Sequence, residues 1–198
     1  MDDSVSMVSP AQPEESCSSV IRVRPDGGLR LGVVSDTHSE PHQGGLAQLA
    51  RLAPDAILHA GDVGDPQVLE ALSSIAPTFS VKGNIDGRSC RLPEALTVKL
   101  VDGERTVLTI LITHIALAGT KLRVDAARLA KHRGASLVVC GHSHVPFIGQ
   151  DRGVTLFNPG SIGPKRFQLP IVFGVLELDR ARVRLSHHDC VSGGPWIP

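Results

Sequence analysis

Short apolar runs alternate with helical patterns along the first half of the chain. The runs that predict buried strands span 29–35, 56–61 and 78–83, and the patterns that predict helices span 45–53 and 66–75. Asp65 followed by Pro66 is a start signal for the second of these helices, because aspartate caps a helix and proline suits its first position. This order predicts a βαβαβ unit with a parallel sheet.

The second half of the chain reads mostly as β-structure. Residues 96–114 predict a hairpin, because Asp102-Gly103 is a turn signal between two β-rich runs. A third helix is expected from Leu122 to His132. The remaining strands are expected at 136–141, 144–149, 154–158, 171–178 and 182–188, with turns at 150–153 and 179–181. A helix-flanked α/β sandwich is the architecture that this order favours.

Composition sets the expected limits of the domain. The chain has 198 residues, of which 41% are hydrophobic and 20% charged, and this suffices for one domain with a buried core. Residues 1–28 are rich in Ser, Pro and Glu and show no apolar periodicity, so we expect a disordered N-terminal tail. The domain is expected over 29–190, with a C-terminal tail over 191–198.

Charge and residue usage exclude several classes of partner. Twenty basic residues balance twenty acidic ones, so nothing predicts broad attraction to nucleic acid or to a membrane. With five Phe, one Trp and no Tyr, no aromatic platform for nucleic-acid bases stands out. No apolar stretch approaches the roughly 20 residues of a membrane-spanning helix. The C-terminal hairpins offer edge strands through which a homo-oligomer could form.

Cysteine usage and the N-terminal residues bear on the compartment. The four cysteines are scattered without a CxxC pair. The first residues lack the basic and apolar regions of a signal peptide. We therefore expect a reduced, cytoplasmic protein.

Polar residues of one chemical kind follow the apolar runs. Ligands in open α/β sheets bind outside the carboxyl ends of the strands, and the residues expected there are Asp36, His38, Asp62, Asn84, His114, His142 and His144. This mixed nitrogen and oxygen set suits Mn, Fe, Co, Ni or Zn better than calcium. Seven groups exceed the needs of one tetrahedral ion and match two ions that share a carboxylate. The sequence therefore predicts a dinuclear metal centre.

A single histidine at a strand end is more often a surface or core residue than a ligand, and the other five histidines are weighed that way. His59 is interpreted as a core or supporting group and His132 as a cation near a helix C-terminus. His187 and His188 point to opposite faces of an expected edge strand. His42 is kept as a catalytic candidate on the substrate side, because its loop follows Asp36 and His38.

The order of the motifs resembles a known family. The motifs Asp36-Thr-His38, Gly61-Asp62, Gly83-Asn84, His114 and Gly141-His142-Ser-His144 resemble the calcineurin-like metallophosphoesterases. The small size and the segment "NPGSIG" at 158–163 resemble their compact prokaryotic branch, the YfcE-type phosphodiesterases. The resemblance covers roughly residues 30 to 178 and implies a single-domain, four-layer α-β-β-α sandwich.

The resemblance also implies a role for each candidate ligand. Asp36, His38 and His144 would hold one metal, Asn84, His114 and His142 the other, and Asp62 would bridge both. The implied activity is that of a phosphodiesterase acting on a small phosphoester. A hydroxide held between two divalent ions, with Mn expected first and Ni, Fe, Co or Zn as alternatives, would attack phosphorus in line. Catalytic roles fall to Asp62, Asn84 and His114.

The chain departs from the superfamily pattern at Ile85, where many members have a histidine that serves the leaving group. Isoleucine donates no proton, so the acid step falls to another group such as His42 or a metal-bound water. Asp86 is a candidate for orienting a ligand or water. Arg88 and Arg166 are candidates for binding the substrate phosphate, and the alternative for each is a solvated surface arginine.

Two further readings of the same centre stay open. A phosphomonoesterase or a nucleotide pyrophosphatase would use the same ligands, because specificity depends on pocket shape. A non-catalytic scaffold, as in the metallophosphoesterase-like subunit of the retromer coat, would need no complete ligand set. All seven positions are filled here, and this favours the enzyme.

Overall fold

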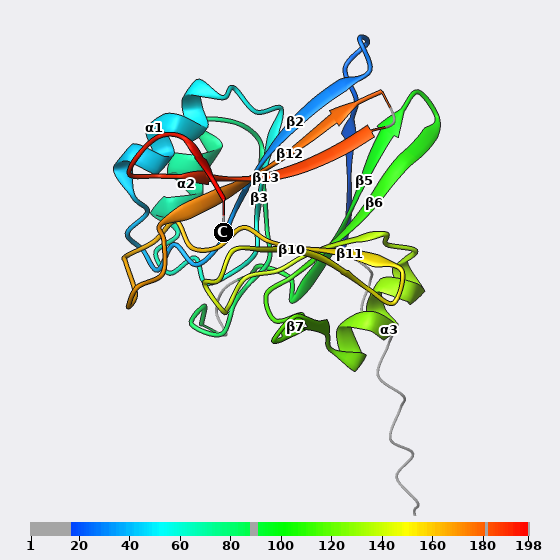
Figure 1. Ribbon diagram of the computed structural model, residues 1–198. Coiled ribbons are helices and arrows are strands. Elements are labelled where there is room, and N and C mark those ends of the chain that lie inside the picture. Colours follow the sequence, from blue (N-terminus) through cyan, green and yellow to red (C-terminus); the bar gives the residue numbers. More distant parts are fainter. Residues whose placement is uncertain (1–16, 88–90, 181, 198) are drawn as a thin grey trace, which may run out of the picture.

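The computed structural model describes residues 17–87, 91–180 and 182–197. Two six-stranded sheets face one another, as Figure 1 shows. The first sheet has the order β1 (Ser18–Arg22), β5 (Ala95–Asp102), β6 (Arg105–Thr113), β9 (Leu137–Val139), β11 (Val154–Asn158) and β10 (Phe147–Asp151). The second has the order β14 (Pro195–Trp196), β13 (Arg182–Asp189), β12 (Val172–Asp179), β2 (Gly28–Val34), β3 (Ala56–His59) and β4 (Thr78–Ser80).

Helices cover the outer faces of the two sheets. Helices α1 (Gln43–Arg51) and α2 (Gln67–Ser73) pack on the second sheet, and α3 (Val124–Arg133) packs on the first. Figure 1 shows α3 at the opposite corner of the molecule from α1 and α2. A two-stranded hairpin, β7 (Leu117–Ala118) and β8 (Lys121–Leu122), precedes α3. The predicted four-layer α-β-β-α arrangement is confirmed.

Three apolar clusters lie between the four layers. The central cluster joins both sheets through residues such as Leu31, Val33, Val98 and Ile110, each with no exposed surface. The other two clusters join each sheet to its own helices. Burial on both faces explains why β2 and β3 are apolar almost without interruption, since parallel strands between two layers have no solvent face.

The predicted connectivity is confirmed in its main parts. Strands β2, β3 and β4 are parallel, with α1 and α2 as crossovers, and β5 and β6 form the predicted antiparallel hairpin. Helix α2 begins at Gln67, one residue later than predicted, and Asp65 Oδ1 accepts a hydrogen bond of 2.9 Å from Gln67 N–H. Within the described residues no helix has the length and apolarity to cross a bilayer.

The predicted tails differ from the structure at both ends. The expected tail at 1–28 contains β1, which pairs in parallel with β5, while residues 1–16 lie outside the described residues. Ile21 is the one buried side chain of β1, so this edge strand leaves no periodic signal. Likewise β14 falls within the expected tail at 191–198 and extends the second sheet by pairing with β13. Both strands are specified by distant partners rather than by local pattern.

Candidate metal centre

The candidate ligands lie in loops at one end of the two sheets. Asp36 and His38 follow β2, Asp62 follows β3, and the remaining candidates follow β4, β6 and β9. The backbone of these loops is cross-linked, because Asp36 N–H donates to Gly61 C=O at 3.0 Å and His38 N–H donates to Asp62 C=O at 3.1 Å. A loop of the first sheet joins them, because His142 N–H donates to Asp36 Oδ2 at 3.1 Å, so loops of both sheets meet at a single edge as the sequence predicts.

The backbone at these positions is held in an uncommon conformation. Five candidates have φ in the left-handed region, namely Asp36 (56°), His38 (46°), Asp62 (57°), His142 (68°) and His144 (58°). L-residues other than glycine adopt this region rarely, and such outliers cluster at functional sites. The structure therefore supports these residues in a geometry that local preference opposes.

Two motif glycines allow the loops to approach one another. A Cβ at Gly83 would collide with the Asp62 carboxylate and backbone, and one at Gly141 would collide with Ser35 and Asp36. Both glycines directly precede candidate ligands, and the absence of a Cβ lets the loops approach one another closely.

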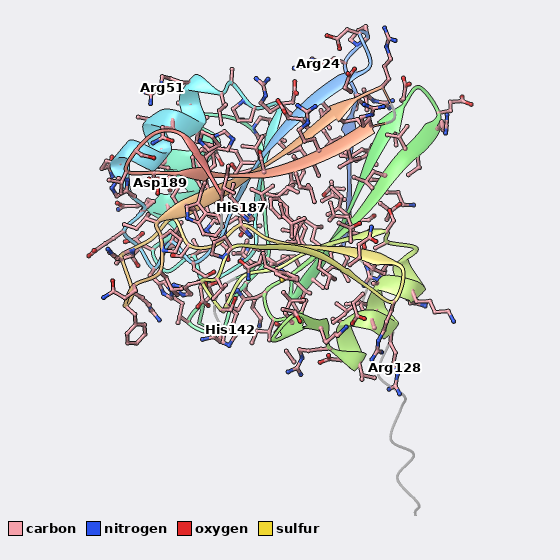
Figure 2. The ribbon with its side chains drawn as sticks, viewed as in Figure 1. Arg24, Arg51, Arg128, His142, His187 and Asp189 are labelled. Atoms are coloured by element: carbon pink, nitrogen blue, oxygen red, sulfur yellow. The ribbon has the colours of Figure 1, made fainter. Side chains whose placement is uncertain are left out.

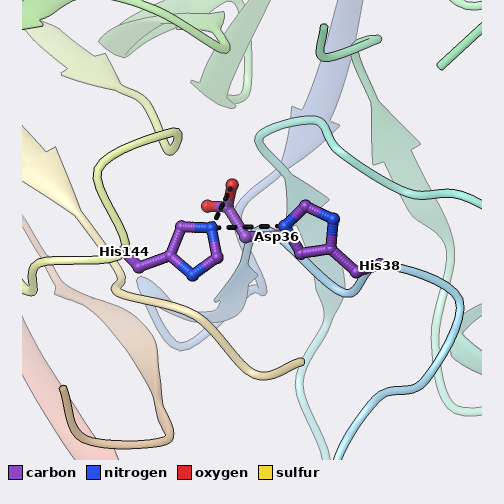
Figure 3. A group of neighbouring side chains, drawn as sticks. All are labelled: Asp36, His38 and His144. Atoms are coloured by element: carbon purple, nitrogen blue, oxygen red, sulfur yellow. Dashed lines mark hydrogen bonds and ion pairs between the residues drawn. The ribbon is translucent and has the colours of Figure 1, made fainter. Parts of the chain in front are cut away.

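Asp36, His38 and His144 form one group of converging side chains, as Figure 3 shows. The Nε2 atoms of His38 and His144 lie 3.2 Å apart, and His144 Nε2 is 3.3 Å from Asp36 Oδ1. Asp36 has no exposed surface, and the Nδ1 atom of His144 is buried without a hydrogen-bond partner among the described residues. Two imidazole nitrogens and a carboxylate oxygen directed at one point fit a metal ion.

Asn84, His114 and His142 form a neighbouring group. Asn84 Oδ1 lies 3.1 Å from His114 Nε2 and 3.0 Å from His142 Nδ1. His114 is buried, whereas Asn84 and His142 are exposed, so this group opens to solvent. The amide oxygen of Asn84 adds a possible metal ligand without adding charge.

Asp62 lies between the two groups. Its Oδ1 atom is 3.3 Å from His114 Nε2, and its Oδ2 atom is 3.8 Å from His38 Nε2. Burial opposes ionisation of this carboxyl, but hydrogen bonds from His114 and from the Ile85 N–H lower its pKa to about 2. Burial also opposes charge on His114, but the hydrogen bonds to Asp62 and the Ala60 C=O, together with the charges of Asp36 and Asp62, outweigh it and raise the His114 pKa. Each oxygen of one ionised carboxylate thus faces a different group.

Asp86 forms hydrogen bonds with the backbone of the loops that carry Asp62 and Asn84. Its carboxylate accepts hydrogen bonds from Gly83 N–H at 2.7 Å, Gly64 N–H at 2.8 Å and Val63 N–H at 3.2 Å. It contacts backbone rather than a candidate ligand side chain. The geometry makes Asp86 a positioning residue for two loops, consistent with its predicted orienting role.

Sequence reasoning missed the contribution of the segment "NPGSIG" to the candidate site. Asn158 Nδ2 donates to Gly141 C=O at 2.8 Å and to Ser143 Oγ at 3.0 Å, and so supports the loop that carries His142. Ser161 Oγ donates to the Asp36 C=O at 3.0 Å. Both side chains are buried. The position of the segment just after β11, at the same sheet edge, is the signal that could have found them.

The remaining candidates lie outside the converging groups or at their margin. His42 Nδ1 accepts a hydrogen bond from Gly45 N–H at 3.2 Å. His42 is therefore the N-cap of helix α1, which is a structural role. Arg166 is exposed, and burial together with the Arg166 charge lowers the pKa of His38. Arg88 lies outside the described residues.

The other histidines lie outside the two groups, and the expected edge strand at His187 and His188 is wrong, because β14 pairs with β13 at both residues. His59 is fully buried, His132 lies in the last turn of α3, and His188 stacks on Phe173 with ring centroids 5.3 Å apart. His187 points inward and its Nε2 atom lies 2.8 Å from Asn158 C=O. His187 and His188 thus face opposite sides of β13.

Comparison with known proteins defines the class of this chain. Residues 29–181 match the model of the calcineurin-like phosphoesterase superfamily domain. The chain belongs to this superfamily, and it carries a candidate metal site built from buried aspartate and histidine. A probable metallophosphoesterase from Methanocaldococcus jannaschii is 29% identical over 180 residues, which cover 88% of this chain and 89% of that protein.

Solved structures share the fold. Vps29 (vacuolar protein sorting 29) from Cryptosporidium parvum superposes with a TM-score of 0.69 at 18% identity and covers 86% of this chain and 96% of its own. The phosphoesterase YfcE from E. coli gives a TM-score of 0.56 at 18% identity, covering 85% of this chain and 97% of its own. An archaeal phosphodiesterase gives 0.57 at 19% identity, covering 80% and 99%. At these identities the likeness concerns the fold alone.

Proposed function

We propose that this protein is a metal-dependent phosphodiesterase with a dinuclear centre. The observation that carries the proposal is the position of Asp62, whose two carboxylate oxygens face His114 and His38 in separate groups of donors. A carboxylate shared in this way suits two ions about 3.5–4 Å apart. Asp36, His38 and His144 would hold one ion, and Asn84, His114 and His142 would hold the other.

The donors fit a transition metal better than a hard cation. Four imidazoles, two carboxylates and one amide oxygen are an intermediate set that suits Mn, Fe, Co, Ni or Zn. The unpartnered Nδ1 of His144 leaves its Nε2 atom as the nitrogen directed at Asp36 and His38. We expect manganese to support activity and treat the other metals as alternatives.

Two bound divalent ions would supply an activated water at neutral pH and positive charge for the phosphoryl oxygens. The chain contributes the rest. Asp36 and Asp62 bring only two negative charges, and Asn84 binds through a neutral oxygen, so the site keeps a positive balance that attracts a phosphodiester. Asp86 fixes the loops of Asp62 and Asn84, and this holds their oxygens in place during reaction.

Ile85 restricts the leaving groups that the site handles well. It follows Asn84, and its side chain is 46% exposed. An aliphatic side chain transfers no proton, so esters of acidic alcohols such as p-nitrophenol should react much faster than esters of ordinary alcohols. His42 is the other candidate for the general acid, but its Nδ1 atom accepts a hydrogen bond from the Gly45 N–H of helix α1.

The test is hydrolysis of bis(p-nitrophenyl) phosphate by purified protein loaded with Mn. Turnover should vanish with a strong chelator and return on addition of Mn, and mass spectrometry of the same sample should give close to two ions per chain. Failure of every transition metal to restore turnover would refute the hydrolytic function. One ion per chain with full turnover would refute the dinuclear centre alone.

The competing proposal is a non-catalytic scaffold. The likeness to Vps29 is the reason to distinguish it from a phosphodiesterase by experiment. Metal binding without turnover on diesters, monoesters or a dinucleoside polyphosphate would favour it. Comparing the rates on these three substrates also separates the diesterase from the monoesterase and pyrophosphatase readings.

A further inference from the structure

Exposed aliphatic residues stand next to three of the candidate metal ligands along the chain. Ile85, Ile115 and Val145 are 46%, 38% and 46% exposed, and each directly follows a candidate ligand in the chain. A fourth apolar residue, Phe167, is 91% exposed and directly follows Arg166. We name these four residues the apolar rim.

The rim residues share one opening because their neighbours do. Consecutive Cα atoms lie 3.8 Å apart, so Ile85, Ile115 and Val145 stay next to Asn84, His114 and His144. Asn84 Oδ1 lies 3.1 Å from His114 Nε2, so two of these neighbours are in direct contact. His144 lies across Asp36 in the adjoining group, and the Asp36 carboxylate accepts from the His142 N–H at 3.1 Å. Three apolar residues therefore lie beside one cluster of polar atoms, and Ile115 lines a cavity together with Asn84 and His114.

Phe167 lies on a loop whose earlier part approaches the same centre. Gly163 packs so closely on the carbonyls of Asp36 and Thr37 that a Cβ there would collide with them. Four residues further along, Phe167 has φ of 52°, a conformation that bulky residues rarely adopt. Its ring is held outside the core although burial would stabilise it. A strained aromatic residue exposed beside a polar site indicates a contact surface.

From this arrangement we propose that the apolar rim binds an aromatic group of the substrate, the organic substituent that the phosphoester carries beside its phosphoryl group. The inference rests on the proposed function and adds a substrate class to it. A phosphate group is polar throughout and offers no apolar surface to bury. Apolar side chains near the metals therefore stabilise a bound ester only through contact with its organic substituent. The flat face of Phe167 and the branched side chains of Ile85, Ile115 and Val145 match a planar ring better than a sugar or a short alkyl group.

The first measurement uses two diesters with one leaving group. The substrates are p-nitrophenyl phenyl phosphate and p-nitrophenyl methyl phosphate, and the readout is the ratio of their kcat/KM values. We expect the Phe167→Ser protein to lower the phenyl-to-methyl ratio about fivefold through KM, and Phe167→Leu to keep most of it. Val191→Ser removes an exposed aliphatic side chain near the C-terminus, beyond β13, and should leave the ratio unchanged.

The second measurement needs no turnover. Calorimetry on Mn-loaded protein compares phenylphosphonate with methylphosphonate, and we expect about tenfold tighter binding of the phenyl compound, reduced in Phe167→Ser. Equal affinities, or a preference that the rim substitutions leave intact, would overturn the substrate role and leave the rim as a surface for a protein. A phenyl preference without hydrolysis of either ester would refute the phosphodiesterase and keep this inference.

Discussion

The two ends of the sandwich both carry ionisable side chains and use them differently. Figure 2 shows Arg24 at one end and His142 at the other. At the Arg24 end, a cavity of about 410 Å³ is lined by four arginines and three acids, namely Arg24, Arg30, Arg182, Arg184, Asp26, Glu177 and Asp179. At the His142 end, the carboxylates of Asp36 and Asp62 are almost completely buried. Both ends carry charged side chains, and the two ends differ in how deeply these side chains are buried.

The partners of these charges explain the difference. Arg30 and Glu177 form an ion pair of 3.1 Å, but both side chains are more than a third exposed, so water shares the interaction. Asp36 and Asp62 accept hydrogen bonds from protein donors and face imidazoles, on a backbone in the left-handed region. Residues in such an arrangement are stabilised by the surrounding fold, and this distinguishes a candidate site from a charged surface.

The strongest test of this contrast is Asp62→Asn. The amide removes the anion that faces both groups, so we expect kcat/KM to fall on the order of a thousandfold, beyond the 10–100-fold of residues that only support ligands. The assay is Mn-dependent diester hydrolysis with metal content measured in parallel. Asp102→Asn makes the same chemical change in the exposed β5–β6 turn and serves as the control. Parental activity in the Asp62 variant would rule out a bridging role.

The next test concerns His59, which is buried at the metal-centre end. Burial lowers its pKa to about 4, and its Nδ1 atom accepts from Gly61 N–H at 3.1 Å while Nε2 lies 3.0 Å from Thr37 Oγ1. The folded pKa lies below that of the unfolded chain, about 6.5, so the unfolded state binds more protons in acid. Stability is therefore complete above pH 6.5 and declines by about 3 kcal/mol as the pH falls to about 4 and below.

Urea denaturation of metal-free protein between pH 4 and 7.5 measures this loss. The His59→Gln protein should show a flatter dependence of unfolding free energy on pH, whatever its stability at neutral pH. His132→Gln, an exposed histidine on α3, is the matched control and should keep the parental slope. Identical slopes for parent and His59→Gln would show that His59 does not carry the effect.

A smaller effect is expected from Asp86→Ala. Three backbone N–H groups lose their acceptor, so the loops of Asp62 and Asn84 should loosen and metal affinity should fall about 10–100-fold. Calorimetric titration with Mn gives the affinity, and saturating metal should recover much of kcat. Asp86→Asn keeps one acceptor oxygen and should fall between parent and alanine variant. An unchanged affinity in Asp86→Ala would remove its positioning role.

The smallest effect is expected at the other end of the molecule. Arg30→Ala removes the exposed pair with Glu177 and the bond to Leu52 C=O, and should cost about 1 kcal/mol of stability or less. Diester hydrolysis and metal content should stay at the parental level. A large loss of activity in this variant would mean that the two ends are coupled, contrary to the comparison above.

Sequence reasoning found the site because its residues stand where buried strands end. Asp36, Asp62 and His142 were recognisable from position and residue type alone, and the structure brings them together. Their left-handed backbone, the bond from His142 N–H to Asp36, and the bracing by Asn158 and Ser161 depend on contacts between distant segments. No local pattern encodes such contacts, and the edge strands β1 and β14 were missed for the same reason.

The hydrogen bonds among the loops at this edge bear on how the proposed ions would enter and leave. His142 N–H to Asp36, Asn158 to the Gly141 C=O, and Ser161 to the Asp36 C=O join the loops entirely through protein atoms. A zinc finger acquires its structure from its ion, whereas these loops are joined by hydrogen bonds among their own residues. For the proposed metal centre we therefore expect ion loading to be a reversible equilibrium separate from folding, in which the bound metal depends on the ions that the surroundings supply.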